Sequence, residues 1–92
     1  MRVELSRQAK KDIQTIPKSV ALKLSLWIVS VEKLGLEQTR QQGGKGLHDE
    51  PLRGKRQGQR SIRLSRSYRA IYTIKKDSIE FVLIEEVNKH EY

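Results

Sequence analysis

Residues 61–84 read SIRLSRSYRAIYTIKKDSIEFVLI, and this segment sets the architecture of the chain. It contains three runs of β-branched, aromatic and other apolar residues, at 61–64, 68–74 and 79–84. The SRS and KKDS sequences between the runs suit short hairpin connections. The pattern therefore predicts three strands in a meander, which form most of a small antiparallel sheet.

The two faces of this predicted sheet differ in polarity. Because side chains alternate along a strand, Ile62 and Leu64 share one face while Ser61 and Arg63 share the other. The second run divides in the same way, into Ala70, Tyr72 and Ile74 on one face and Arg69, Ile71 and Thr73 on the other. We expect helices to cover the first face and the second to be basic, concave and partly hydrated.

The segment before the sheet predicts one strand and two helices. Val3 and Leu5 alternate with polar residues, as in a short half-buried strand, and Ser6 follows as an N-cap. Pro17 separates the first helix from the second, which ends at Gly35. The two helices carry apolar residues at helical spacing: Ala9, Ile13, Ile16, Val20, Leu24, Trp27, Ile28, Val31 and Leu34. Such a stripe is typical of core packing, so we assign Trp27 no function.

The polar, glycine-rich stretch 38–46 is predicted to be a mobile connection between the second helix and the sheet. Its Gly-Gly-Lys-Gly lacks both the spacing of a phosphate-binding loop and the Ser or Thr that follows one. The chain shows no repeat and no domain boundary. We therefore predict one domain, 1–92, of the α+β class with the order β-α-α-β-β-β, in which two helices pack on a small, mainly antiparallel sheet.

The positive charge of the chain is concentrated in one segment. Residues 45–76 hold ten basic and two acidic residues, which gives +8, whereas the other nine basic and nine acidic residues cancel. Such a segment is typical of a surface that binds nucleic acid, because each Lys or Arg that meets a phosphate releases counterions. A hydrated face that keeps the protein in solution is the alternative.

The composition also excludes several classes of site. The chain has no cysteine and two histidines, so disulfides and thiolate metal sites are excluded, and we expect neither a metal nor another cofactor. No run approaches the roughly 18 apolar residues of a membrane span, and no apolar segment follows the N-terminal charges. We therefore expect a cytoplasmic protein without a membrane partner.

Four short motifs occur in order on this predicted architecture: EPLRG at 50–54, QRSIRL at 59–64, YRAIY at 68–72 and HEY at 90–92. With them the chain resembles the RelE/ParE toxin superfamily over almost its whole length. It resembles most the ribosome-dependent messenger-RNA endonucleases of the RelE, YoeB and HigB type, which are toxins of type II toxin-antitoxin systems. The resemblance implies a RelE-like fold and metal-independent cleavage of messenger RNA in the ribosomal A site.

The resemblance also implies roles for individual residues. Glu50 matches the glutamate that is regarded as the general base, and Arg69 matches the arginine that faces the scissile phosphate. His90 corresponds to the catalytic histidine, a candidate general acid, while Tyr92 would orient the phosphate or stack on a base. His48 resembles a histidine of the HigB-like members and is either an alternative base or a group that stacks on a nucleobase.

The residue types suit these roles, although each residue also has a plainer interpretation. A guanidinium stays charged and binds two phosphate oxygens at once, and an imidazole titrates near neutrality. Glu50 is otherwise a turn residue paired with an arginine, Arg69 a paired or hydrated strand residue, and His90 part of a frayed terminus. Glu91 separates His90 from Tyr92, whereas the two are adjacent in YoeB-like members, and the acid and base roles of Glu50 and His90 remain exchangeable.

Five further basic residues are predicted to contact the backbone of ribosomal and messenger RNA: Lys55, Arg56, Arg60, Arg63 and Arg66. The implied partners are therefore the ribosome, at the A site of the 30S subunit, messenger RNA and a cognate antitoxin. Two other functions stay open. The chain is alternatively a ParE-like inhibitor of DNA gyrase, a branch that generally lacks the terminal His and Tyr, or a non-catalytic RNA-binding module.

Overall fold

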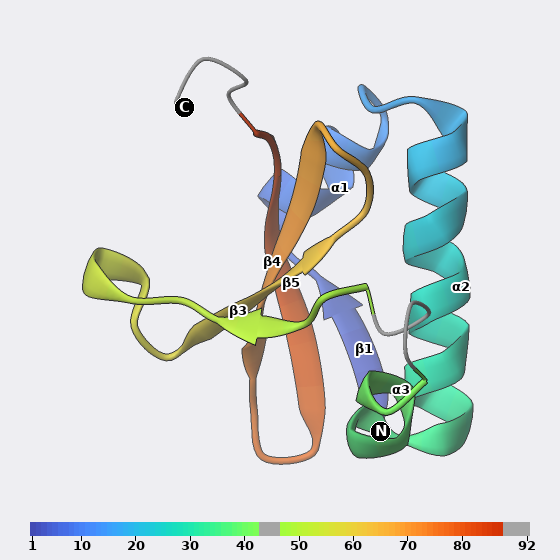
Figure 1. Ribbon diagram of the computed structural model, residues 1–92, viewed down its shortest axis with the longest axis vertical. Coiled ribbons are helices and arrows are strands. Elements are labelled where there is room, and N and C mark those ends of the chain that lie inside the picture. Colours follow the sequence, from blue (N-terminus) through green and yellow to red (C-terminus); the bar gives the residue numbers. More distant parts are fainter. Residues whose placement is uncertain (43–46, 88–92) are drawn as a thin grey trace.

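Five strands form one mixed sheet in the order β1-β5-β4-β3-β2 within residues 1–42 and 47–87, the part of the chain that the computed structural model describes (Figure 1). The strands are β1 (Arg2–Leu5), β2 (Glu50–Pro51), β3 (Gln59–Arg63), β4 (Tyr68–Ile74) and β5 (Ser78–Glu86). Neighbouring strands from β5 to β2 pair antiparallel, as the meander predicted, whereas β1 pairs parallel to β5.

Helices cover one face of this sheet. They are α1 (Arg7–Ile13), α2 (Lys18–Leu34) and α3 (Leu36–Arg40), and a 3₁₀ turn, η2 (Gly54–Arg56), lies in the connection between β2 and β3. Ser6 caps α1 as predicted, because its Oγ accepts a hydrogen bond from the backbone N–H of Ala9 at 3.0 Å. Gly35 ends α2 with φ +87°, a conformation that favours glycine.

The core lies between the helices and the apolar face of the sheet. Trp27 of α2 packs against Tyr72 of β4 and Phe81 of β5, with ring centroids 5.4 and 5.5 Å away. All three residues are fully or almost fully buried, so the prediction that Trp27 is a packing residue is confirmed. A bulge in the β4–β5 ladder shifts the alternation of β5 by one residue, which brings both Phe81 and Ile84 into the core.

The α+β class and the order of the predicted elements are confirmed, and the structure adds a helix, a strand and a 3₁₀ turn that were not predicted. The predicted connection 38–46 is helical at its start, since α3 extends to Arg40; residues 43–46 lie outside the described part of the chain. The apolar pattern of α3 is short, but Leu36 is buried and the buried Thr39 donates to the carbonyl of Gly35. Strand β2 has only two residues and carries no periodicity.

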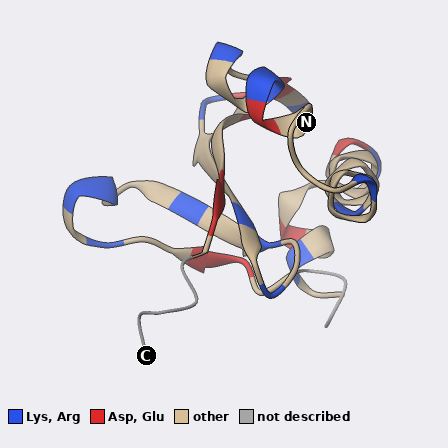
Figure 2. Cartoon of the chain, turned by 90° about the horizontal axis from the view of Figure 1, so that it is seen from above, with Lys and Arg blue, Asp and Glu red and all other residues tan. Residues whose placement is uncertain are grey.

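Two residues predicted to lie in the core are exposed, and one of them, Leu34 at the end of α2, is 48% exposed. The other, Ile74, is the last residue of β4, and it is 47% exposed because it borders the exposed turn 75–77. Conversely, Ile71 is fully buried on the opposite face, which the sequence analysis expected to be partly hydrated. The connection between β2 and β3 projects from the body of the molecule and carries basic residues (Figure 2).

Candidate functional site

Two rows of paired residues define the face of the sheet that the helices leave open. One row crosses the sheet through Glu50, Ser61, Ile71 and Leu83. The other row, two positions further along the strands, is Arg63, Arg69 and Glu85. Directly paired residues and residues two apart project to the same side, so these seven side chains share one surface, here called the open face.

The second row holds a cluster of three charges, Arg56, Arg69 and Glu85. Arg69 donates a hydrogen bond from Nε to Oε1 of Glu85 at 2.6 Å, and its Nη2 lies 2.5 Å from the same oxygen in an ion pair. The other carboxylate oxygen of Glu85 lies 3.9 Å from Nη2 of Arg56. Since Arg56 comes from η2 and Glu85 from β5, this contact brings a side chain of the projecting β2–β3 connection to the second row of the open face.

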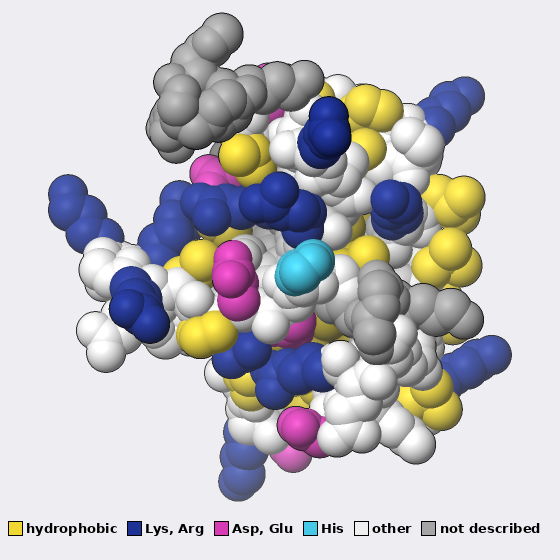
Figure 3. All heavy atoms as spheres, in the orientation of Figure 1, with side chains coloured by type: hydrophobic (Ala, Val, Ile, Leu, Met, Phe, Trp, Pro, Cys, Tyr) yellow, Lys and Arg dark blue, Asp and Glu magenta, His cyan; other side chains and the backbone are white. Residues whose placement is uncertain are grey.

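The remaining basic residues of the predicted RNA-binding set differ in what they contact. Lys55, Arg63 and Arg66 are exposed, and no ion pair is found for them within residues 1–42 and 47–87. Arg60 instead donates to Asp49, with its Nε 2.6 Å from Oδ1. Figure 3 shows basic side chains as a band across this side of the molecule, next to an acidic side chain and a histidine.

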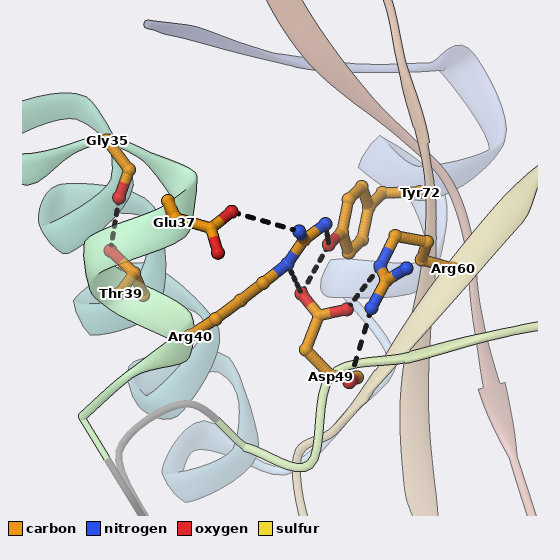
Figure 4. Close-up of polar contacts among 7 residues, drawn as sticks. All are labelled: Gly35, Glu37, Thr39, Arg40, Asp49, Arg60 and Tyr72. Carbon is orange, nitrogen blue, oxygen red and sulfur yellow. Dashed lines mark hydrogen bonds and ion pairs between the residues drawn. The ribbon is translucent and has the colours of Figure 1, made fainter.

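Arg60 belongs to a buried polar network that the sequence analysis missed (Figure 4). Asp49, whose side chain is only 2% exposed, accepts hydrogen bonds from Arg60 of β3, Arg40 of α3 and the hydroxyl of Tyr72. Arg40 also donates to Tyr72, from Nη2 at 3.3 Å. Burial and the hydrogen bond to Asp49 together raise the pKa of Tyr72 to about 12. The Asp49 network thus ties three elements to the segment that enters β2.

This anchored segment carries two predicted site residues, Glu50 and His48. Both are exposed, whereas the side chain of Asp49 between them points inward. His48 and the preceding Leu47 have φ of +49° and +57°, left-handed conformations that are uncommon outside glycine. Because the Asp49 network holds the backbone here, Glu50 is fixed beside Ser61 at the edge of the open face.

The structure thus brings Glu50 and Arg69 onto one face, with His48 in the segment beside it. His90 and Tyr92 lie outside the described residues. The last described residue, Val87, donates its backbone N–H to the carbonyl of Ser67 at 2.6 Å. Strand β5 therefore ends beside the start of β4, where Arg69 lies.

Glu85 was not among the site residues predicted from the sequence. The third apolar run stopped at residue 84, whereas β5 continues to Glu86, and only the cross-strand register reveals that Glu85 faces Arg69. No group of acidic or histidine side chains within the described residues has the arrangement of a metal site. None of the helices in that part of the chain combines the length and apolar character that crossing a membrane requires.

The chain is similar to known toxins. A family model, described as the ParE toxin of the type II toxin-antitoxin system parDE, matches residues 3–91. No curated protein sequence matches the chain significantly.

Solved structures of similar fold include three toxins. The RelE of the archaeal RelE–RelB complex from Pyrococcus horikoshii superposes with a TM-score of 0.71 at 20% identity, over 96% of each chain. A chain of the YoeB–YefM complex from Staphylococcus aureus gives 0.69 at 22% identity, over 96% of this chain and 98% of that one. A YoeB/ParE toxin from Agrobacterium tumefaciens gives 0.69 at 15% identity, over 96% and 100%. At these identities the likeness establishes the RelE-like fold.

Proposed function

This chain belongs to the ParE toxin family and is thus a type II toxin of the RelE/ParE superfamily, and we propose that it is a ribosome-dependent endoribonuclease. It cleaves messenger RNA in the A site of the 30S subunit, in the cytoplasm, without a metal, and thereby stops translation. The observation that carries this proposal is that Glu50 and Arg69 lie on one face of the sheet, together with the basic residue Arg63. Their Cα atoms are two strands and two positions apart, or about 12 Å, which leaves room for a ribose and its phosphate.

The proposed reaction needs only groups that this chain supplies. Glu50 takes the proton from the 2′-hydroxyl, and the 2′-oxygen attacks the adjacent phosphorus to form a 2′,3′-cyclic phosphate. The bond from phosphorus to the 5′-oxygen breaks, and His90 gives that oxygen a proton. Arg69 binds the phosphate oxygens, on which charge grows in the transition state. Tyr92 orients the phosphate, and His48 is the alternative base.

The reach of the chain supports the role of His90. His90 is three residues beyond Val87, and three residues span at most about 10 Å. Since Val87 is bound to Ser67 beside the start of β4, this reach includes the neighbourhood of Arg69. Lys55, Arg56, Arg63 and Arg66 would hold the RNA backbone by charge. Arg60, also predicted for this role, instead pairs with Asp49 on the side of β3 that faces the core residue Tyr72.

An antitoxin is the other proposed partner. The YoeB of Staphylococcus aureus and the RelE of Pyrococcus horikoshii were crystallised with YefM and RelB. We propose that a cognate antitoxin likewise binds this chain and covers its basic open face, where acidic side chains would find complementary charge.

Primer extension on a messenger RNA in a reconstituted translation reaction tests the proposal. The wild type should cut at codons in the presence of ribosomes and leave free RNA intact. Glu50→Gln and His90→Ala should lower the cleavage rate by about 10²- to 10⁴-fold, and Arg69→Gln by about 10²- to 10³-fold. RNA affinity should change little in Glu50→Gln, whereas a pure RNA-binding module would show no such difference between rate and affinity.

Matched controls keep the result specific. Glu86→Gln and Arg7→Gln change exposed residues away from the open face and should cut like the wild type. Intact message and unaffected translation with the wild type would contradict the proposed nuclease.

Inhibition of DNA gyrase is the second candidate function, because the matching family model is that of the ParE toxin. A gyrase supercoiling assay with the purified wild type decides it. Loss of supercoiling activity without any cleavage of message would establish the ParE-like function instead.

A further inference from the structure

The guanidinium proposed to bind the scissile phosphate is already occupied in this structure. One carboxylate oxygen of Glu85 accepts a hydrogen bond from Nε of Arg69 and lies 2.5 Å from Nη2 on the same edge of the guanidinium. That edge is the donor pair which a guanidinium offers to two oxygens of a phosphate. Glu85 therefore lies where an RNA phosphate would have to lie.

The backbone itself enforces this contact. Arg69 and Glu85 are directly paired across the antiparallel β4–β5 ladder, so their side chains leave the sheet next to each other. Both are half-buried, with side chains 35% and 28% exposed, beside the fully buried Ile71. Solvent therefore screens the pair less than it would screen two fully exposed charges.

Glu85 also neutralises more than one cation. Its second oxygen attracts Arg56, and on the other side of Arg69 lies Arg63, a like charge paired directly across β3 and β4. A row with two adjacent arginines is unfavourable by itself and attracts anions. In the free protein, the carboxylate of Glu85 partly neutralises the positive charge of this row.

We propose that Glu85 is a specificity-determining residue that competes with RNA phosphate for Arg69 and Arg56. This inference rests on the proposed function. A phosphodiester must displace the carboxylate before Arg69 can bind it, so free single-stranded RNA binds weakly. RNA that other contacts hold against the open face has a high effective concentration and displaces Glu85.

Anisotropy of a fluorescent, single-stranded 2′-O-methyl RNA tests this inference, since that RNA lacks the attacking hydroxyl and is not cut. The Kd is measured between 50 and 300 mM KCl for the wild type, Glu85→Gln and Glu85→Asp. Each phosphate contact with a single strand makes the slope of log K against log salt more negative by about 0.7. At 0.1 M salt, such a contact raises the affinity by roughly fivefold. Glu85→Gln should thus bind about 5- to 25-fold more tightly, with a slope steeper by about 0.7 to 1.4, and Glu85→Asp should stay close to the wild type.

Two further variants separate competition from a structural role. Glu86→Gln removes the same charge from the neighbouring position, which projects to the opposite side of β5, and should change Kd less than threefold. Arg69→Gln should cost little affinity in the wild-type background, where Glu85 already occupies Arg69, but should abolish most of the gain in the Glu85→Gln background. A loss of fold would appear as weaker binding in both backgrounds.

Unchanged or weakened binding by Glu85→Gln, with an unchanged salt slope, would overturn the inference. An equal gain in Glu86→Gln would overturn it as well, since the gain would then come from net charge alone. The cleavage assay reports separately on the nuclease, so a wild type that cuts message while Glu85→Gln binds like the wild type refutes only the role of Glu85.

Discussion

Tyr72 places its hydroxyl against Asp49 inside the molecule, and burial is the main reason that its pKa rises from 10.0 to about 12. Such a phenol favours the folded state only while it is protonated. Its contribution is therefore complete below pH 10 and is lost as the pH rises towards 12. A shift of this size corresponds to about 2 to 3 kcal/mol.

Urea unfolding between pH 9 and 11.5 tests this expectation. The unfolding free energy of the wild type should fall by about 2 kcal/mol more than that of Tyr72→Phe, which has no group to ionise at this position. At pH 9 the variant should be less stable by about 1 kcal/mol, because it lacks the hydrogen bonds of the hydroxyl. Parallel pH profiles for the two proteins would refute the link between Tyr72 and alkaline unfolding.

The sequence could not reveal the Asp49 network for a geometric reason. Arg40, Asp49, Arg60 and Tyr72 come from three elements and a loop, and the pairs that bond are up to 32 positions apart. Asp49 counted as one acidic residue in a basic segment, and nothing near it in sequence marks it as buried. By contrast, Glu50 and Arg69 stand in recognisable motifs, so they could be singled out before their position was known.

At the scale of the elements, Gly35 controls the sharp junction between α2 and α3. Its φ of +87° and ψ of 163° belong to a region that is essentially restricted to glycine, although no atom lies within 4 Å of a Cβ added there. Gly35→Ala should therefore lower the unfolding free energy by about 1 to 3 kcal/mol through backbone strain alone. Thermal unfolding monitored by circular dichroism measures the loss.

Ser25→Ala serves as the control for Gly35→Ala, because Ser25 is exposed on α2 and alanine favours a helix. It should leave the stability unchanged or slightly higher. If Gly35→Ala were as stable as this control, the positive φ at the junction would not require glycine.

Long elements with a clear period were predictable, whereas short ones were not. Strand β4 spans the predicted 68–74, and α2 ends at Gly35 as its apolar stripe and glycine indicated. Helix α3 and strand β2 have five and two residues, too few for a period to appear, and tertiary packing rather than local propensity stabilises them. The bulge that brings Ile84 into the core depends on the pairing of β4 with β5 and leaves no mark in the sequence.

At the scale of the whole molecule, the first strand depends on the last. Strand β1 pairs only with β5 among the described strands, from Arg2 opposite Ser78 to Leu5 opposite Phe81. Strand β5 also accepts the backbone N–H and the hydroxyl of Ser6 and donates from Ile84 to Asp12 of α1. Without β5, neither β1 nor α1 has its partner.

A chain that ends at residue 77 should consequently fail to fold, even though it keeps all three helices. We expect its amide hydrogens to exchange at the rates of an unfolded chain, while β4 and β5 of the full chain are strongly protected. Native-like protection of α1 in the shortened chain would show that the N-terminal segment folds without β5.

The parallel pairing of β1 with β5 also orders events during synthesis. Strand β1 is made before every other described strand and β5 after all of them, and residues 6–77 separate the two. The growing chain therefore cannot complete its sheet until β5 has left the exit tunnel, and until then β1 has emerged without the strand that it pairs with. A single late event, the emergence of β5, thus converts the incomplete chain into the folded toxin.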